Sequence, residues 1–323
     1  MTRTLCMSVS QKILGTCILK FPLKSKTELE FWKSNYKSIP NLLVCPIHKI
    51  PERINFTDAS MYAGAGFIDG NVLQIAHNMF SELERLKSST WRELKSVEFI
   101  LESMFAQLAG KLVKFYTDNQ NFVHICQVGS MKPDLHELAV NIYTTCIVNS
   151  ITIEVEWIPR SEYVKADYFS RIFVFDDWAV TNSVFLIFNR WEKLFFDRFA
   201  DYKNHKIDRS NSKFWVPGTQ GVDEFAFDWS GENNWIVPPV GIVCRVLNHM
   251  LTCRVLVVPK WKSALFLPMV WNNKENKFYE FITDFVEFDR LKHFFLLDSA
   301  KDSVFVQSPF ISNVLVSKLD CLS

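Results

Sequence analysis

Phe56-Thr57-Asp58-Ala59-Ser60, followed by Gly64, Gly66 and the pair Asp69-Gly70, is the stretch of sequence that decides the fold. We expect residues 56–68 to form a first β-strand in which the two glycines permit close backbone approach. Asp69-Gly70 is a strong hairpin signal, so a second strand at 72–75 should pair antiparallel with the first. An acidic residue inside such a strand would be held on a rigid element.

The pattern after this hairpin predicts one α/β domain over residues 51–175, with a mixed sheet and flanking helices. Thr90 and Glu93 have capping-box spacing, so a long helix should begin there and end at Gly110. An apolar run at 112–116 and an alternating stretch at 151–157 predict two further strands, the last stopped by Pro159. We expect the first strand to be central in this sheet.

The flanking regions are less sharply patterned. Residues 1–50 contain a helical pattern at 26–33 that Ser25 or Thr27 can cap, and they are too short to fold alone. Residues 176–323 predict a second α/β domain of the Rossmann-like kind, with helices at 184–196 and around 242–250 and a buried strand at 253–258.

Composition limits the class of protein. A chain of 323 residues, 48% hydrophobic and 22% charged, can build two domains with real cores. Its formal net charge is only +1, so a nucleic-acid partner would be held by local basic patches. No apolar run predicts a membrane span and the start predicts no signal peptide, so we expect an intracellular protein, cytoplasmic or nuclear. The scattered cysteines predict buried free thiols without a zinc site.

Four acidic residues suit a site that hydrolyses phosphodiesters with two metal ions. They are Asp58, Glu93, Asp118 and Asp167. Mg2+, or Mn2+ in its place, prefers hard oxygen ligands, and two ions about 4 Å apart activate water and offset transition-state charge. We expect Asp58 to bridge both ions, Glu93 and Asp118 to hold one, and Asp167 to complete the other. Taken singly, each Asp also fits a turn or a cap, and Glu93 fits a capping partner of Thr90.

The flanks of these acids resemble the ribonuclease H domain of retroelement polyproteins. The matching segments are Phe56–Ser60, Trp91–Lys95, Tyr116–Asn119, Trp157–Arg160 and Ala166–Arg171. The resemblance implies a metal-dependent endoribonuclease that cuts the RNA strand of RNA·DNA hybrids, with the four acids as catalytic and metal-binding residues. Tyr163 stands where related sequences commonly carry Asn, which bears on substrate contact or loop geometry.

The flanking regions are similar to parts of DIRS-type elements. Residues 1–50 look like a remnant of the reverse transcriptase connection, which implies an upstream reverse transcriptase, although no Tyr-x-Asp-Asp motif occurs. Residues 176–323 resemble a DNA adenine methyltransferase-like domain, carried by Phe196–Ala200, Asp228–Ser230 and Trp235–Val240. That resemblance makes Asp197 and Asp228 candidates for contacts to S-adenosylmethionine.

Three functions remain open from the sequence. The first is the ribonuclease H, and the second is a non-catalytic nucleic-acid-binding remnant of a retroelement polyprotein. The third and least favoured is adenine methyl transfer, because Val237 and Val240 stand where the enzymes carry a polar acceptor and an aromatic ring. Basic residues near the acids, among them Arg160 and Arg171, are candidates for a phosphate track or for ordinary surface charges.

Overall fold

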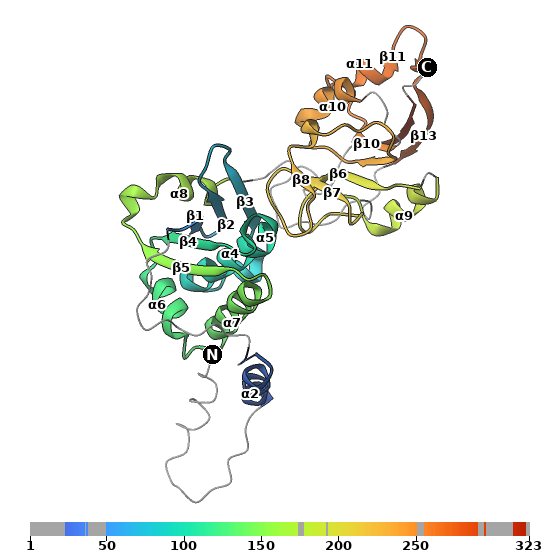
Figure 1. Ribbon diagram of the computed structural model, residues 1–323. Helices are drawn as coiled ribbons and strands as arrows, with labels where there is room; N and C mark the ends of the chain where they lie inside the picture. Colours follow the sequence, from blue (N-terminus) through green and yellow to red (C-terminus); the bar gives the residue numbers. More distant parts are fainter. Residues whose placement is uncertain are drawn as a thin grey trace, which may run out of the picture. The chain divides into compact units, whose positions relative to one another are not determined.

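The computed structural model describes residues 23–35, 37, 50–173, 178–191, 193–250, 255–289, 294 and 313–320. Its contacts divide the chain into two units. Among the described residues, the first unit holds those up to Ile75 and Leu83–Arg171, and the second holds Ala76–Glu82 and those from Ile172 onward. The elements of both can be followed in Figure 1.

A five-stranded sheet in the order β3-β2-β1-β4-β5 belongs to the first unit, except for the part of β3 from Ala76 onward. Its strands are β1 (Arg53–Ala59), β2 (Ala63–Ile68), β3 (Gln74–Met79), β4 (Leu112–Thr117) and β5 (Thr152–Trp157). β1 pairs antiparallel with β2 and parallel with β4, and β4 pairs parallel with β5. The predicted mixed sheet and the central position of the strand that carries Asp58 are therefore confirmed.

One strand prediction was wrong: residues 56–68 form two strands and not one. The chain turns between β1 and β2, where the Ser60 hydroxyl accepts hydrogen bonds from the backbone N–H groups of Tyr62 and Ala63, each at 3.0 Å. A serine side chain can satisfy the backbone of a tight turn in this way. The run of apolar and small residues hides that turn in the sequence.

The first unit also contains helices. They are α2 (Leu23–Asn35), α3 (Glu82–Arg85), α4 (Ser89–Ser103), α5 (Phe105–Leu108), α6 (Gln120–Val128), α7 (Pro133–Val148) and α8 (Val164–Ser170), with the 3-10 turn η1 (Arg160–Glu162). Three predicted boundaries were wrong. Ser88 caps α4 by accepting from the Trp91 N–H, so Thr90 lies inside the helix. The long helix ends at Ser103 and not at Gly110, and α2 begins before Ser25 and Thr27.

Helices α4 and α8 pack on β1 and β2 from opposite faces of the sheet. On one face Gly66 of β2 approaches α4 so closely that an added Cβ would lie 2.3 Å from the Ile100 Cδ1 atom. On the other, Phe56 and Phe67 stack with ring centroids 5.0 Å apart and pack near Tyr163 and Ala166 of the α8 region. Both helices therefore reach the same end of β1.

The second unit contains a seven-stranded sheet in the order β13-β14-β10-β9-β6-β7-β8. Its strands are β6 (Phe196–Ala200), β7 (Ser210–Ser212), β8 (Gly221–Val222), β9 (Asn234–Ile236), β10 (Val255–Pro259), β13 (Ile282–Phe288) and β14 (Val314–Leu319). The strands from β10 to β8 are mutually parallel, and β14 is antiparallel to both of its neighbours. A separate pair consists of β11 (Trp271–Asn272) and β12 (Lys277–Phe278).

Helices lie on both faces of this second sheet. The elements are α9 (Asn182–Trp191), α10 (Val243–His249) and α11 (Leu267–Val270), with the 3-10 turns η2 (Glu224–Ala226) and η3 (Val240–Ile242). Alternate residues of β10 join different apolar clusters: Val255 packs with Phe188 of α9, whereas Leu256 packs with Val246 of α10. Because successive strand residues point to opposite faces, the two clusters are the two sides of an α/β layer structure.

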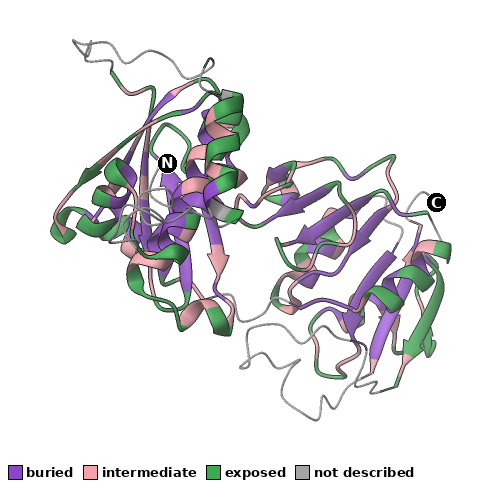
Figure 2. Cartoon of the chain, turned by 90° about the horizontal axis from the view of Figure 1, so that it is seen from below, coloured by how far each residue is buried: buried purple, intermediate pink, exposed green. Residues whose placement is uncertain are grey.

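The boundaries in the second unit differ modestly from the prediction. The helix predicted over 184–196 ends at Trp191, and Phe196 begins β6. The strand predicted from Cys253 starts in the described chain at Val255, and Cys253 itself lies outside the described residues. Figure 2 shows that buried residues concentrate on the strands in both units, while exposed residues gather on the outer helices and loops. The predicted α/β class is confirmed in both.

Candidate metal centre

The parallel pairing of β1 and β4 brings two of the predicted acids together. Phe56 pairs with Tyr116 in this ladder, and continuing the register by two residues places Asp58 beside Asp118. Asp58 is the penultimate residue of β1, and Asp118 directly follows β4. Since the carboxyl ends of parallel strands meet at one edge of a sheet, both side chains lie at that edge.

Glu93 reaches the same edge from α4. Its Oε1 atom accepts a hydrogen bond from the Ala59 N–H at 3.2 Å, which ties the helix to the end of β1. Glu93 is therefore not a capping partner of Thr90, because Ser88 caps this helix. The other carboxylate oxygen, Oε2, is buried and has no hydrogen-bond partner.

Asp58, Glu93 and Asp118 form one group of potential metal ligands. Each offers a carboxylate oxygen, and these three oxygens lie within 4.8 Å of one another. Burial raises the pKa of Asp58, an effect that the Ser170 hydrogen bond opposes and the charges of Asp118 and Asp167 reinforce. Burial also raises the pKa of Glu93 well above its ordinary value, with the charges of Asp58 and Asp118 acting in the same direction.

This donor set fits a hard divalent cation. All three groups supply oxygen, which Mg2+ and Mn2+ prefer. Buried polar atoms in proteins are normally hydrogen-bonded, so the unpartnered Glu93 Oε2 is an exception that a bound cation would satisfy. Close carboxylates repel one another unless a positive charge sits between them. The three residues therefore fit the metal that the sequence predicts.

Asp167, the fourth predicted ligand, is held differently. It lies in α8 and is not among the three grouped carboxylates. Arg171 donates from Nε to Asp167 Oδ2 and from Nη2 to Oδ1, each at 2.8 Å, and Arg160 donates from Nη2 to Oδ1 at 2.7 Å. Hydrogen bonds from Arg171 are the main reason that the pKa of Asp167 is lowered.

Two serines that the sequence reasoning missed support the site. The buried Ser170 hydroxyl donates to Asp58 Oδ2, and Ser60 Oγ donates to the Ser170 carbonyl at 2.7 Å. These bonds join the end of β1 to the end of α8, so they orient the Asp58 carboxylate. Ser60 lies two residues after Asp58 and Ser170 three after Asp167, within the very segments that carry the ribonuclease H resemblance.

Two aromatic residues also shape the surroundings of the acids. The Trp157 indole donates to the Asp118 carbonyl at 3.0 Å, which fixes the loop after β4. Tyr163 is only 1% exposed, and its hydroxyl donates to the Tyr116 carbonyl at 2.9 Å. In this chain Tyr163 therefore anchors the loop before α8 to β4, so it positions that loop from the core.

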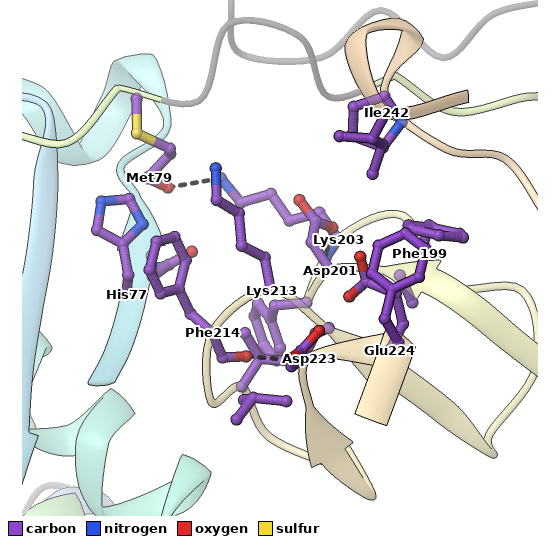
Figure 3. Close-up of a pocket in the computed structure, with 18 of the residues that line it drawn as sticks. His77, Met79, Phe199, Asp201, Lys203, Lys213, Phe214, Asp223, Glu224 and Ile242 are labelled. Carbon is purple, nitrogen blue, oxygen red and sulfur yellow. Dashed lines mark hydrogen bonds between the residues drawn. The ribbon is translucent and has the colours of Figure 1, made fainter. Parts of the chain in front are cut away.

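The second unit has a cavity of about 490 Å3 near the carboxyl ends of β6, β7 and β8. Figure 3 shows Phe199, Asp201, Lys213 and Asp223 among its lining side chains. Asp223 has a φ of 58°, a backbone conformation that side chains other than glycine rarely adopt. Parallel α/β sheets commonly bind ligands at this end of their strands.

Asp197 and Asp228, the two residues predicted to contact S-adenosylmethionine, do not line this cavity. Asp197 is buried in β6, where Oδ2 accepts from the Lys206 N–H at 2.9 Å, and burial raises its pKa to about 7. Asp228 is exposed and forms a local turn by accepting from the Ser230 N–H at 2.8 Å. Both carboxylates have these structural roles in the free chain.

No protein-family model and no curated protein matches this sequence. Among solved structures, the chain is similar over 36% of its length to ribonuclease H1 of the archaeon Halobacterium salinarum, covering 92% of that chain at 13% identity and a TM-score of 0.32. It is similar over 36% of its length to LC11 ribonuclease H1 in complex with an RNA/DNA hybrid, covering 93% of that chain at 19% identity and a TM-score of 0.31.

A third similar structure is the foamy viral protease-reverse transcriptase in complex with an RNA/DNA hybrid. That likeness covers 47% of this chain and 27% of that chain, at 12% identity and a TM-score of 0.30. At such TM-scores these likenesses carry no weight for function, which rests on the acids described above. Within the described residues, no helix has the length and apolar character needed to cross a bilayer.

Proposed function

We propose that the first unit is a metal-dependent ribonuclease H that cuts the RNA strand of RNA·DNA hybrids. The observation that carries this proposal is the group formed by the buried Asp58 and Glu93 and the half-buried Asp118, in which the Glu93 Oε2 atom has no partner. Such an arrangement is costly for a purely structural role, because three acids repel one another and one oxygen stays unsatisfied. It suits a site whose charge is balanced by bound cations.

The residues of the site have distinct roles in this proposal. Asp58, Glu93 and Asp118 would hold the cation, and Ser170 keeps the Asp58 carboxylate oriented through its hydrogen bond. Divalent metal ions at such a site lower the pKa of a water nucleophile and neutralise charge on the phosphoryl group. Asp167, which the sequence predicts as a further ligand, supplies a fourth carboxylate in α8.

The origin of the chain is part of the same proposal. We infer that it derives from a DIRS-type retroelement polyprotein, downstream of a reverse transcriptase, from the motif segments around the four acids. The second unit would then be a methyltransferase-like domain without methyl transfer. Its strand order supports this, since the parallel strands run outward from β6 to β8 and then resume on the other side at β9, as in doubly wound nucleotide-binding sheets.

The residue after β9 supports the loss of methyl transfer. Val237 is 5% exposed and belongs to the apolar cluster around Trp235, so it packs in the core and offers no hydrogen-bond acceptor to a base. We expect no transfer of labelled methyl groups from S-adenosylmethionine to adenine in DNA. Transfer above that of a heat-denatured sample would refute this part of the proposal.

Hybrid cleavage tests the main proposal. The full chain should cut the labelled RNA strand of a hybrid in Mg2+ or Mn2+, and Asp58→Asn and Asp118→Asn should each abolish cutting while circular dichroism stays unchanged. Asp134→Asn is a matched control, because Asp134 lies in the first turn of α7, away from the grouped acids. Equal cutting by the wild type and the two site variants would refute the proposal. Hybrid binding without hydrolysis in either metal would instead support the nucleic-acid-binding remnant.

A further inference from the structure

Two guanidinium groups occupy three of the about four acceptor sites of the Asp167 carboxylate. Its Oδ1 atom accepts from Nη2 of both Arg160 and Arg171, at 2.7 and 2.8 Å, and its Oδ2 atom accepts from Arg171 Nε at 2.8 Å. A carboxylate oxygen has two lone pairs, so Oδ1 has no further acceptor capacity. Two positive charges also surround the carboxylate, which lowers its attraction for a cation. Oδ2 keeps one acceptor site, but a cation there would be repelled by both guanidinium groups, so metal binding by Asp167 is disfavoured in the free chain.

The two arginines are well placed for another partner. Their side chains are 66% and 60% exposed, against 28% for Asp167, so solvent and ligands can reach both. Arg160 interacts electrostatically with Asp118 and Asp58, and Arg171 interacts with Asp58, so both guanidinium groups are within electrostatic range of the candidate metal centre. Within the described chain, this rim of the acidic group thus carries positive charge that faces outward.

Guanidinium groups bind phosphate through the same fork of donors that they offer to a carboxylate. Ion pairs between exposed side chains contribute little to stability, so exchanging one anionic partner for another costs little. A phosphodiester strand that approaches the buried acids needs positive charge on its path, since the acids alone would repel it. The arginine pair supplies that charge at the edge of the site.

We propose that Arg160 and Arg171 release Asp167 and bind phosphate groups of the incoming nucleic-acid strand, so that Asp167 joins the metal centre only when substrate is present. Substrate binding and completion of the ligand set are then one event. This inference rests on the proposed ribonuclease function. The arginines act here as positioning residues, because they control the availability of another residue's carboxylate.

Manganese binding without nucleic acid tests the first part of the proposal, that the two arginines keep Asp167 from binding metal in the free chain. Titration followed by electron paramagnetic resonance should count one tightly bound Mn2+ in the wild type and two in the double variant R160Q/R171Q, because the variant frees Asp167. Adding D167N to the double variant should return the count to one. Arg53→Gln is the control, since Arg53 is an exposed residue at the opposite end of β1 from Asp58 and should leave the count unchanged. Equal counts in the wild type and the double variant would overturn the inference.

The affinity of the protein for hybrid in Ca2+ tests the second part of the proposal, that the two arginines bind phosphate groups of the nucleic-acid strand. For each phosphate that the protein no longer neutralises, the slope of log affinity against log salt should flatten by about 0.7–0.9. The slope measured for the double variant should therefore be flatter by about 1.4–1.8, and this variant should bind hybrid at least tenfold more weakly. R53Q should match the wild type in both measurements. Because both arginines are exposed, the single variants R160Q and R171Q should fold normally and each give about half the change in slope. An unchanged slope in all three would overturn the inference.

The two proposals fail in different ways. If the wild type cuts hybrid but the arginine variants change neither the manganese count nor the salt slope, the exchange is wrong and the ribonuclease function stands. If the wild type neither binds nor cuts hybrid, the proposed function and the phosphate half of the exchange are both refuted. In that case one tightly bound Mn2+ in every variant would also refute the first part of the proposal, that the arginines keep Asp167 from binding metal.

Discussion

Replacing Glu93 by Gln should stabilise the metal-free protein while removing its stabilisation by metal. The carboxylate oxygens of Glu93, Asp58 and Asp118 lie within 4.8 Å of one another. Two unit charges at that distance repel by about 3.5 kcal/mol at an effective dielectric constant of about 20. Gln keeps an oxygen for the Ala59 N–H bond but carries no charge, so the substitution relieves this repulsion and the cost of burying the charge.

The expected gain is about 3 kcal/mol at pH 8 in the presence of a chelator. A change of that size corresponds to a rise in the unfolding midpoint of about 4 °C for a chain of 323 residues. Mg2+ at about 1,000 times its Kd should reverse the ranking, because it then stabilises the wild type by about 4.1 kcal/mol. The variant lacks one ligand and should respond much less.

Thermal unfolding by circular dichroism, with and without Mg2+, measures both effects. Glu102→Gln is the matched control, because Glu102 lies on the same helix α4 but outside the grouped acids. It should leave the response to Mg2+ unchanged. A metal-free midpoint of the Glu93→Gln variant at or below that of the wild type would refute the electrostatic reasoning. An undiminished Mg2+ response in this variant would refute the metal assignment.

Two further predictions concern stability. Gly66→Ala should destabilise the chain by about 1–3 kcal/mol in urea unfolding, because the new Cβ would overlap Ile100 and approach the Phe56 carbonyl to 2.9 Å; Ile100→Val should recover only part of the loss, and an unchanged midpoint would contradict the close approach. Asp197 binds a proton in the folded chain up to about pH 7 but in the unfolded chain only below about pH 4, so wild-type stability should fall as pH rises through this window. The free energy of unfolding of the wild type, measured relative to that of Asp197→Asn, should fall by about 4 kcal/mol in total, at about 1.4 kcal/mol for each of roughly three pKa units. A difference in free energy of unfolding between the two proteins that stays constant with pH would contradict this prediction.

The sequence predicted the positions of the acids better than the boundaries of the elements. Strands β4 and β5 were predicted closely, because β4 is a short apolar run, β5 alternates polar and apolar residues, and turn residues follow each. The turn after β1 was missed, because the Ser60 side chain satisfies the backbone there without a Gly or Pro at that point. The start of α4 was misplaced because Ser88, Ser89 and Thr90 are all good caps, and only the structure shows that Ser88 accepts the bond.

The candidate site shows the same division between local and long-range information. Asp58 and Asp118 each follow from a strand pattern, but their proximity depends on the β1–β4 register, which no local pattern contains. The Arg171–Asp167 pair has the spacing of one helical turn and is readable in the sequence. The second partner, Arg160, lies in the 3-10 turn before α8, and its approach depends on the fold of that loop.

The two ways in which this chain treats its carboxylates favour a site that is completed by its ligands. Asp58, Glu93 and Asp118 are packed together with a raised pKa at Asp58 and Glu93 and with an unsatisfied oxygen, so the free protein stores repulsion that a cation would remove. Asp167 has a lowered pKa and accepts three hydrogen bonds from guanidinium groups, so its charge is already offset in the free protein. Because a fourth carboxylate without a partner would add to the repulsion, the arginines allow the fold to keep the half-buried Asp167 near the other acids at little cost in stability.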